Sequence, residues 1–200
     1  KKGKKILYVG KATSLKDRVK SYFGKDVAET RGPRIVNMCK LANSLEYKLT
    51  DSVLEALILE AALIKRHQPK YNSDEKDDKS WNYVVITREA FPRVLTVRGK
   101  NLPFFEDPIF FQAGSFPHGG ELTEAMKIIR KIFPYRDNCT PFDGTQGKPC
   151  FNAQIGLCPG VCSGAITKRE YARTIRHLKL FFQGKKGELV RQIEKEMKIP

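Results

Sequence analysis

Residues 52–66 read SVLEALILEAALIKR and carry the clearest helical pattern in the chain. Ser52, followed three residues later by Glu55, has the form of a capping box, which opens a helix. Apolar residues then recur at the spacing of one helical face, and Pro69 stops the pattern just beyond Arg66. The sequence therefore predicts an amphipathic helix from Ser52 to about Arg66.

Glu60 interrupts the apolar stripe of this helix. Ala56 and Leu57 precede it, and Leu63 and Ile64 follow it, at the spacings that share one face. An unpaired buried carboxylate is costly, so Glu60 is expected to have an Arg, a Lys or a metal cation as its partner. The alternative is that Glu60 lies at the edge of the stripe and reaches water.

The residues before this helix predict two strands and two further helices. Ile6 to Gly10 form a short apolar strand, and Ser14 to Asp17 have the form of a capping box that opens a helix through about Phe23. Pro33 is a good first position for a second helix, which should run to Ala42. Leu45 to Thr50 alternate apolar with polar residues, as a half-buried strand does.

Four side chains of this region suit chemistry on a phosphate. Tyr8 lies on the predicted strand, Lys11 in the turn after it, and Arg18 and Tyr22 one helical turn apart. Together with Glu60, they provide an acid for a divalent cation, an arginine for a phosphate and a tyrosine for a proton. Spacing alone does not show that they converge, and the alternative is that the tyrosines are core aromatics and Arg18 a surface charge.

The order of elements predicts an α/β (α+β) chain with two domains. Residues 83–87 and 94–97 have the form of a β-hairpin, so residues 1–100 are expected to form a compact mixed domain. Residues 101–121 are rich in Pro, Gly and Phe, which is typical of a linker. Residues 122–200 should form a helical module, with helices expected at 123–133, 167–184 and 188–198.

The composition indicates a polyanionic partner. Lys and Arg number 37 against 22 Asp and Glu, which gives a formal charge of +15 and a pI near 9.7. Nucleic acid is the favoured partner over a solvated basic surface or an acidic membrane, and no apolar run approaches the roughly 20 residues of a membrane span. A cytoplasmic location is expected. Phosphate contacts without sequence readout are predicted from basic residues in the first helix (Lys16, Arg18, Lys20), at Lys65-Arg66, and in the late helix (Lys168, Arg169, Arg173, Arg176, Lys179).

Four cysteines crowd one short segment: Cys139, Cys150, Cys158 and Cys162. In a reducing compartment such a cluster indicates metal ligation rather than disulfides. Four thiolates suit one tetrahedral zinc ion or one iron–sulfur cluster, and ligand identity does not choose between them. The fifth, Cys39, falls inside a predicted helix and is expected to be a small core residue.

Several motifs together resemble the UvrC family of GIY-YIG nucleases, over nearly the whole chain. The resemblance begins with Tyr8-Val9-Gly10-Lys11-Ala12. It continues through Leu15, Arg18, Ser21-Tyr22-Phe23, Glu55 to Glu60, Leu63-Ile-Lys65, Pro69-Lys-Tyr-Asn72, Asp77-Asp-Lys-Ser80, the four cysteines and Phe181-Phe-Gln-Gly184-Lys185.

The resemblance implies a small nuclease domain with a mixed sheet flanked by helices, followed by a Cys-rich metal-binding module. It implies that Glu60 holds Mg²⁺ or Mn²⁺, that Arg18 stabilises charge on the phosphate, and that Tyr8 acts as or positions the general base. Lys11, Tyr22 and Asn72 would organise the site or touch DNA. The four cysteines would bind a [4Fe–4S] cluster, with Zn²⁺ as the alternative. The family cuts the damaged strand on the 3′ side of a lesion, with UvrB as its partner and UvrA upstream.

Two features depart from the family pattern. The first GIY-YIG motif should lie upstream of Ile6, where only Lys1-Lys-Gly-Lys-Lys5 stands, so we expect a part of a larger enzyme whose activity belongs to the parent. Phe111 to Pro117 also read differently from the family. The alternatives are a stand-alone repair nuclease resembling Cho and, from another class, a non-catalytic DNA-binding metal module.

Overall fold

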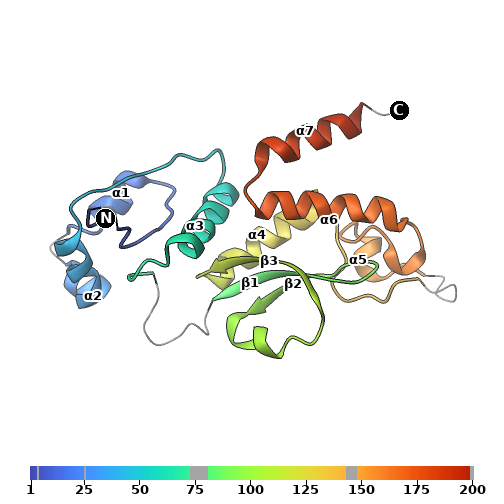
Figure 1. Cartoon of the computed structure of the whole chain (residues 1–200), viewed down its shortest axis with the longest axis horizontal. Helices are drawn as coiled ribbons and strands as arrows, with labels where there is room; N and C mark the ends of the chain where they lie inside the picture. The colour runs from blue at the N-terminus through green and yellow to red at the C-terminus, as the bar shows by residue number, and fades with distance from the viewer. Residues whose placement is uncertain (4, 25, 73–80, 143–147, 199–200) are drawn as a thin grey trace. The chain divides into compact units, whose positions relative to one another are not determined.

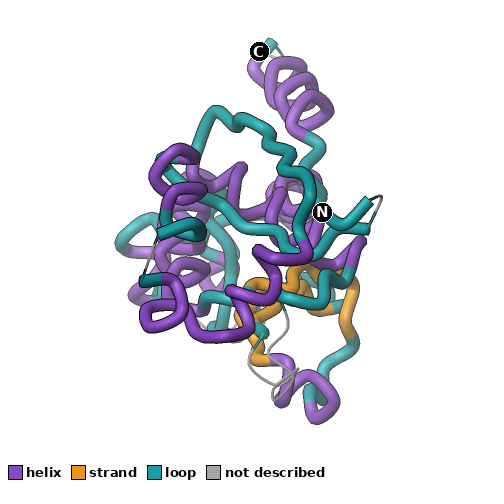
Figure 2. The backbone as a smooth tube through the Cα atoms, turned by 90° about the vertical axis from the view of Figure 1, so that its left-hand side faces the viewer, coloured by secondary structure: helices purple, strands orange, loops and turns teal. Residues whose placement is uncertain are grey.

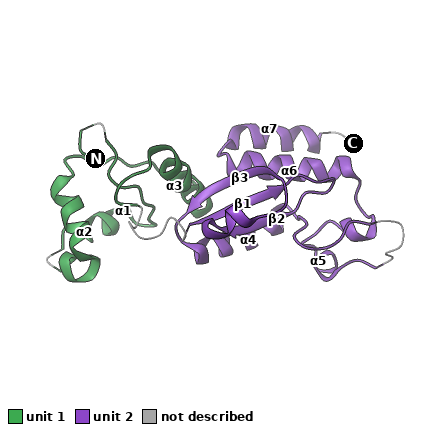
Figure 3. Ribbon diagram, turned by 60° about the horizontal axis from the view of Figure 1, so that its bottom comes forward, with its two compact units in different colours: residues 1–78 green, residues 79–200 purple. Residues whose placement is uncertain are grey.

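The structure is a computed structural model that describes residues 1–3, 5–24, 26–72, 81–142 and 148–198. It comprises two compact units, residues 1–78 and residues 79–200 (Figure 3). The motif at residues 77–80 lies outside the described residues. Each unit is considered by itself.

The first unit contains the helices α1 (Leu15–Lys20), α2 (Val27–Leu41) and α3 (Val53–His67) (Figure 1). The Ser14 hydroxyl accepts from the Asp17 N–H, and the Ser52 hydroxyl accepts from the Glu55 N–H, so both predicted helix starts are confirmed. The α2 helix is interrupted at Gly32, whose φ of 79° is not helical. Its second part therefore begins at Pro33, as the sequence predicts.

The two strands expected in the first unit are wrong, because the described residues provide neither segment with a partner strand. Residues 6–10 and 42–50 have no helix or strand assignment. Figure 2 draws such segments in teal, as loop. The Asn72 side chain takes the place of a neighbouring strand, since it bonds both the N–H and the C=O of Val9, at 2.7 Å each. Leu7, Met38 and Tyr71 form the core beneath this segment.

The second unit contains an antiparallel sheet of β1 (Asn82–Thr87), β2 (Val94–Arg98) and β3 (Ile109–Phe116), in the order β2-β1-β3. The β1–β2 pair confirms the predicted hairpin, with Val84 opposite Thr96. The other edge of β1 pairs with β3, with Val84 opposite Ala113. Residues 109–116 of the segment expected as a linker are therefore strand β3 of the sheet, and the two compact units meet at residues 78 and 79.

Helices flank this sheet in Figure 3 and complete the second unit. The three long helices, α4 (Gly119–Ile132), α6 (Lys168–Phe182) and α7 (Lys186–Met197), confirm the predicted ones within a few residues. Thr167 and Glu170 form the full capping box of α6. Three short helices were not foreseen: η1 (Gly99–Phe104), α5 (Phe151–Gln154) and η2 (Val161–Ser163).

The chain is a mixed α/β protein, as expected. No helix among the described residues is long and apolar enough to cross a membrane.

Candidate active site

Glu60 is buried on α3, with 7% of its surface exposed. Its Oε1 accepts a hydrogen bond from the Lys11 backbone N–H at 3.0 Å, and its Oε2 lies 3.4 Å from the Lys11 ammonium. Oε2 accepts no hydrogen bond from any residue that the structure describes. A buried carboxylate is therefore held by one lysine, with one oxygen still able to bind a cation.

The loop at residues 7–11 carries Tyr8 and Lys11, and tertiary hydrogen bonds fix it. Besides the two bonds from Asn72 to Val9, the Tyr71 N–H donates to the Leu7 carbonyl at 3.0 Å. At Gly10, a Cβ atom would lie only 2.7 Å from the Tyr8 ring. Glycine is therefore needed there so that the ring can fold back over the turn.

Arg18 and the two tyrosines form a contact group beside this loop. The Arg18 Nη2 donates to the Tyr8 hydroxyl at 3.0 Å, and the Tyr8 and Tyr22 ring centroids are 6.0 Å apart. Burial would lower the pKa of Arg18, but the Tyr8 and Tyr22 hydroxyls and the Glu60 carboxylate raise it overall. Burial and hydrogen bonding to Tyr8 raise the pKa of Tyr22. Arg18 thus stays charged and Tyr22 stays neutral near pH 7.

The structure brings the six residues predicted for this site together. They are Tyr8, Lys11, Arg18, Tyr22, Glu60 and Asn72. Arg31 is an addition that the sequence analysis missed: its guanidinium lies 4.8 Å from the Tyr22 ring centroid, and its Nη2 donates to the Ser21 hydroxyl. Arg31 belongs to no sequence motif, so only its contact with Tyr22 in the folded chain reveals it. It lies on the part of α2 that precedes the kink at Gly32.

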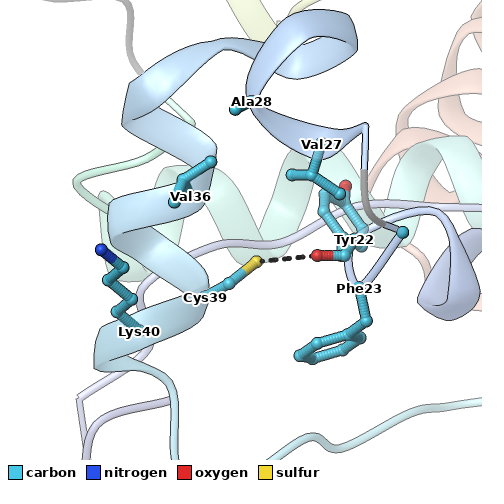
Figure 4. A pocket seen from close by; sticks show the side chains of 8 residues that line it. Tyr22, Phe23, Val27, Ala28, Val36, Cys39 and Lys40 are labelled. Carbon is cyan, nitrogen blue, oxygen red and sulfur yellow. Dashed lines mark hydrogen bonds between the residues drawn. The ribbon is translucent and has the colours of Figure 1, made fainter.

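A hollow of about 380 Å³ lies between the segment that follows α1, at Tyr22 to Gly24, and the α2 helix (Figure 4). Cys39 borders it, and its thiol donates to the Tyr22 carbonyl at 3.5 Å. Burial raises the pKa of the Cys39 thiol, which keeps it protonated. Cys39 packs partly buried against the core, in keeping with the small core residue expected.

The cysteine module gathers three sulfur atoms into a metal-sized cluster. The Sγ atoms of Cys139, Cys150 and Cys162 all lie within 4.8 Å of one another, and this triad could bind a metal. The Cys150 N–H donates to the Cys162 sulfur at 3.2 Å. Burial, followed by the nearby Cys158, Cys150 and Cys162, raises the pKa of Cys139 to about 12. Cys158 is buried beside the triad but is not part of it.

Polar side chains hold the loops of this module. Arg130 donates to the Asp137 carboxylate at 2.6 Å and to the Leu157 carbonyl at 2.8 Å. The Asn152 carbonyl accepts from the backbone N–H groups of Leu157 and Cys158. The Cys158 backbone is therefore held by Asn152, and Arg130 joins the adjacent loop to Asp137.

Comparison with known proteins identifies both halves of the chain. Residues 1–73 match the model of the UvrC-like GIY-YIG domain, and residues 81–181 match that of the UvrC/Cho excinuclease middle domain. These matched segments agree with the two compact units. No solved structure matches the chain significantly.

Curated relatives match across the chain. The UvrABC system protein C of Gloeobacter violaceus is 40% identical over 193 residues, which is 96% of this chain and 30% of the relative. The proteins of the same name from Methanothermobacter thermautotrophicus and Carboxydothermus hydrogenoformans are also 40% identical, over 97% of this chain and 31% of each relative. The chain spans about 30% of the length of the curated relatives it matches.

Proposed function

Because this chain belongs to the UvrC family, we propose that it carries the DNA-hydrolysing site of an incision subunit for nucleotide excision repair. The proposed reaction is metal-dependent hydrolysis of a phosphodiester bond on the 3′ side of a lesion. The observation that carries the proposal is the buried Glu60 carboxylate, which has one oxygen without a hydrogen bond and lies beside Lys11 and Arg18.

The residues around Glu60 fit a divalent cation. Hard cations such as Mg²⁺ and Mn²⁺ bind carboxylate oxygens, and they often use only one or two protein carboxylates. The Oε2 of Glu60, which accepts no hydrogen bond in the described residues, is such a ligand, and the Lys11 ammonium paired with it at 3.4 Å can move away on its flexible side chain. When bound, the cation would polarise the scissile phosphate and neutralise charge on the leaving oxygen.

The other side chains of the site have separate roles in this proposal. Arg18 is charged and half-buried, so it can bind the phosphate oxygens where charge increases in the transition state. The Tyr8 hydroxyl accepts from Arg18, which leaves its own proton free to orient or exchange with the attacking water. Asn72 positions the loop that carries Tyr8 and Lys11, and Tyr22 supports Tyr8 and Arg18 from behind.

We propose that the cysteine module binds a [4Fe–4S] cluster through Cys139, Cys150, Cys158 and Cys162, with Zn²⁺ as the alternative. Four thiols, with an N–H donated to one sulfur, suit an iron–sulfur cluster. The spacing of the triad also suits one tetrahedral ion with metal–sulfur bonds of about 2.3 Å. Iron and zinc analysis of protein purified without oxygen separates these two cofactors.

The proposed partners are DNA and UvrB, with UvrA acting earlier on the same lesion. A chromosomal substrate would place the protein in the cytoplasm. A stand-alone enzyme resembling Cho is the second candidate, because the matched middle-domain model describes both UvrC and Cho. Dependence of incision on UvrB distinguishes the two, since a stand-alone nuclease would cut without it.

Glu60→Gln in the full-length protein tests the proposed function. We expect loss of Mg²⁺- or Mn²⁺-dependent 3′ incision of a lesion-containing duplex, in the presence of UvrA and UvrB, with DNA binding nearly unchanged. The matched control is Glu55→Gln, in the first turn of the same helix, where the half-buried carboxylate accepts from the Asp51 N–H. Undiminished incision by Glu60→Gln would remove Glu60 from the metal site.

A further inference from the structure

The α6 helix presents a basic stripe on its solvent face. At 100° per residue, Arg169, Ala172, Arg173, Arg176 and Lys179 fall within one sector of about 120°. The first four are exposed, whereas Lys179 is half-buried. The opposite face contains the buried residues Tyr171, Ile175, Leu178 and Phe182, which fix the orientation of the helix. Leu180, at the C-terminal end of the basic sector, is also buried, so the exposed part of the stripe runs from Arg169 to Arg176.

The acidic side chains of α6 and α7 leave this stripe largely uncompensated. Glu170 is held by Thr167, Glu188 pairs with Lys185 at 3.5 Å, and Glu196 lies 3.3 Å from His177. In the described part of the chain, no carboxylate forms an ion pair with Arg169, Arg173 or Arg176. Glu170 attracts Arg173 electrostatically without forming an ion pair with it, so Arg169 and Arg176 are the least compensated charges of the stripe.

One end of the stripe meets the exposed side of β3. The Lys179 ammonium lies 4.8 Å from the Phe110 ring centroid and 5.9 Å from that of Phe111. Phe110 is 45% exposed. This cation–π contact holds the lysine at the surface of the sheet, so the charge of the stripe extends from the helix onto β3.

The length and chemistry of the stripe fit the backbone of a DNA duplex. From Arg169 to Lys179 the helix rises about 15 Å, which matches roughly four base-pair steps. Arginine bonds phosphate oxygens through two parallel N–H groups, so it suits phosphate better than a diffuse anionic surface. Stacking on bases would need aromatic side chains along the stripe, whereas Phe110 stands only at one end.

We propose that Arg169, Arg173, Arg176 and Lys179 form a phosphate-binding surface for double-stranded DNA on the second unit. The inference rests on the proposed function in that DNA is the substrate. It adds a DNA-binding surface outside the first unit, which contains Glu60. Because the contacts are with phosphates, the surface binds without regard to sequence, as repair of varied lesions requires.

The test is the triple variant Arg169→Gln, Arg173→Gln, Arg176→Gln in the 200-residue chain. The probe is an undamaged 20-base-pair duplex with a fluorescent end label, titrated by anisotropy in EDTA over a series of salt concentrations. Each phosphate contact contributes about 0.9 to the slope of log K against log salt, so the slope should become shallower by about 2.7. Circular dichroism checks the fold.

A charge-matched control separates a local contact from a change in net charge. Lys100→Gln, Lys127→Gln and Lys131→Gln remove the same charge from exposed positions of the same unit and should change the slope by less than one. Equal slopes for the two triple variants would overturn the surface. A larger loss of affinity for a single strand than for the duplex would overturn the duplex assignment.

The outcome is independent of catalysis, because EDTA removes the divalent cation. If the Glu60→Gln variant still cuts DNA while the triple arginine variant loses duplex binding, the proposed surface is supported and the proposed metal site is excluded. If Glu60→Gln abolishes cutting while the triple arginine variant binds the duplex as the wild type does, the metal site is supported and the surface is excluded.

Discussion

The Arg136 guanidinium donates to the Glu89 carboxylate at 2.6 Å, joining two residues 47 positions apart. The same Nη1 donates to the Phe91 carbonyl at 2.6 Å, and Nε donates to the Cys139 carbonyl. Tyr171 completes the junction, since its hydroxyl accepts from the Arg136 N–H and donates to the Pro92 carbonyl. The β1–β2 turn, the first cysteine and α6 are therefore linked through one buried arginine.

Glu89→Gln should destabilise the second unit in a pH-dependent way. Burial alone would raise the pKa of Glu89, but hydrogen bonds from Thr87, Arg136 and Arg93 lower it from 4.5 to about 2. A lowered pKa means that the carboxylate stabilises the fold above about pH 4.5 and loses this effect as the pH falls toward 2. We expect a loss of about 1–3 kcal/mol at pH 7, measured by urea unfolding.

The difference between wild type and Glu89→Gln should shrink between pH 5 and pH 2.5. Glu106→Gln is the control, because Glu106 is an exposed carboxylate of the same unit. A difference that stays constant over this pH range would show that the glutamine disturbs packing rather than removing the charge.

Arg18→Gln should slow incision by the full-length protein by about 10²–10³-fold at saturating metal, because it removes a charge from the site of phosphate binding. Loss of this positive charge should lower the cleavage rate at saturating DNA more than it raises the DNA concentration that gives half of that rate. Single-turnover cleavage of a labelled duplex measures both quantities. Lys20→Gln, on an exposed position of the same helix, should change the rate less than threefold. Equal effects of the two variants would show that Arg18 contributes only general electrostatic attraction for DNA.

Asn72→Asp should loosen the loop that carries Tyr8 and Lys11. Aspartate can still accept from the Val9 N–H, but its carboxylate cannot donate to the Val9 carbonyl, so one of the two 2.7 Å bonds is lost. We expect a cost of about 1–3 kcal/mol, seen as faster amide hydrogen exchange at residues 7–11. Unchanged exchange at Val9 would show that the loop holds its position without Asn72.

Cys158→Ser should remove metal from the second unit and lower its stability. Cys158 is buried beside the triad, and serine cannot supply the thiolate ligand. Iron and zinc per chain, with thermal unfolding of the second unit, measure the two effects. Cys39→Ser is the matched control and should leave the metal content unchanged, since Cys39 belongs to the first unit. A fully metallated Cys158→Ser chain would exclude Cys158 as a ligand.

Local pattern was sufficient for the long helices and for the hairpin, but not for the short helices η1, α5 and η2. The cap at Ser52, the start at Pro33 and the capping box at Thr167 depend on contacts within one turn, so short-range sequence rules describe them. The strands expected at residues 6–10 and 45–50 did not form, because a strand depends on contacts outside its own segment. A strand needs a partner, and apolar alternation does not supply one.

The same distinction between local pattern and long-range contact holds for the candidate site. The sequence by itself determined which residue types serve the chemistry, because Glu60 in an apolar stripe and four clustered cysteines stand out from their neighbours. Only the tertiary structure decided that Glu60 meets the Lys11 N–H, that Asn72 holds Val9, and that Arg136 joins Glu89 to Cys139. It also moved β3 from a presumed linker into the sheet. Apart from the Arg136–Cys139 bond, these contacts join residues far apart in the chain, and their free energy depends on burial and geometry that no local window of sequence contains.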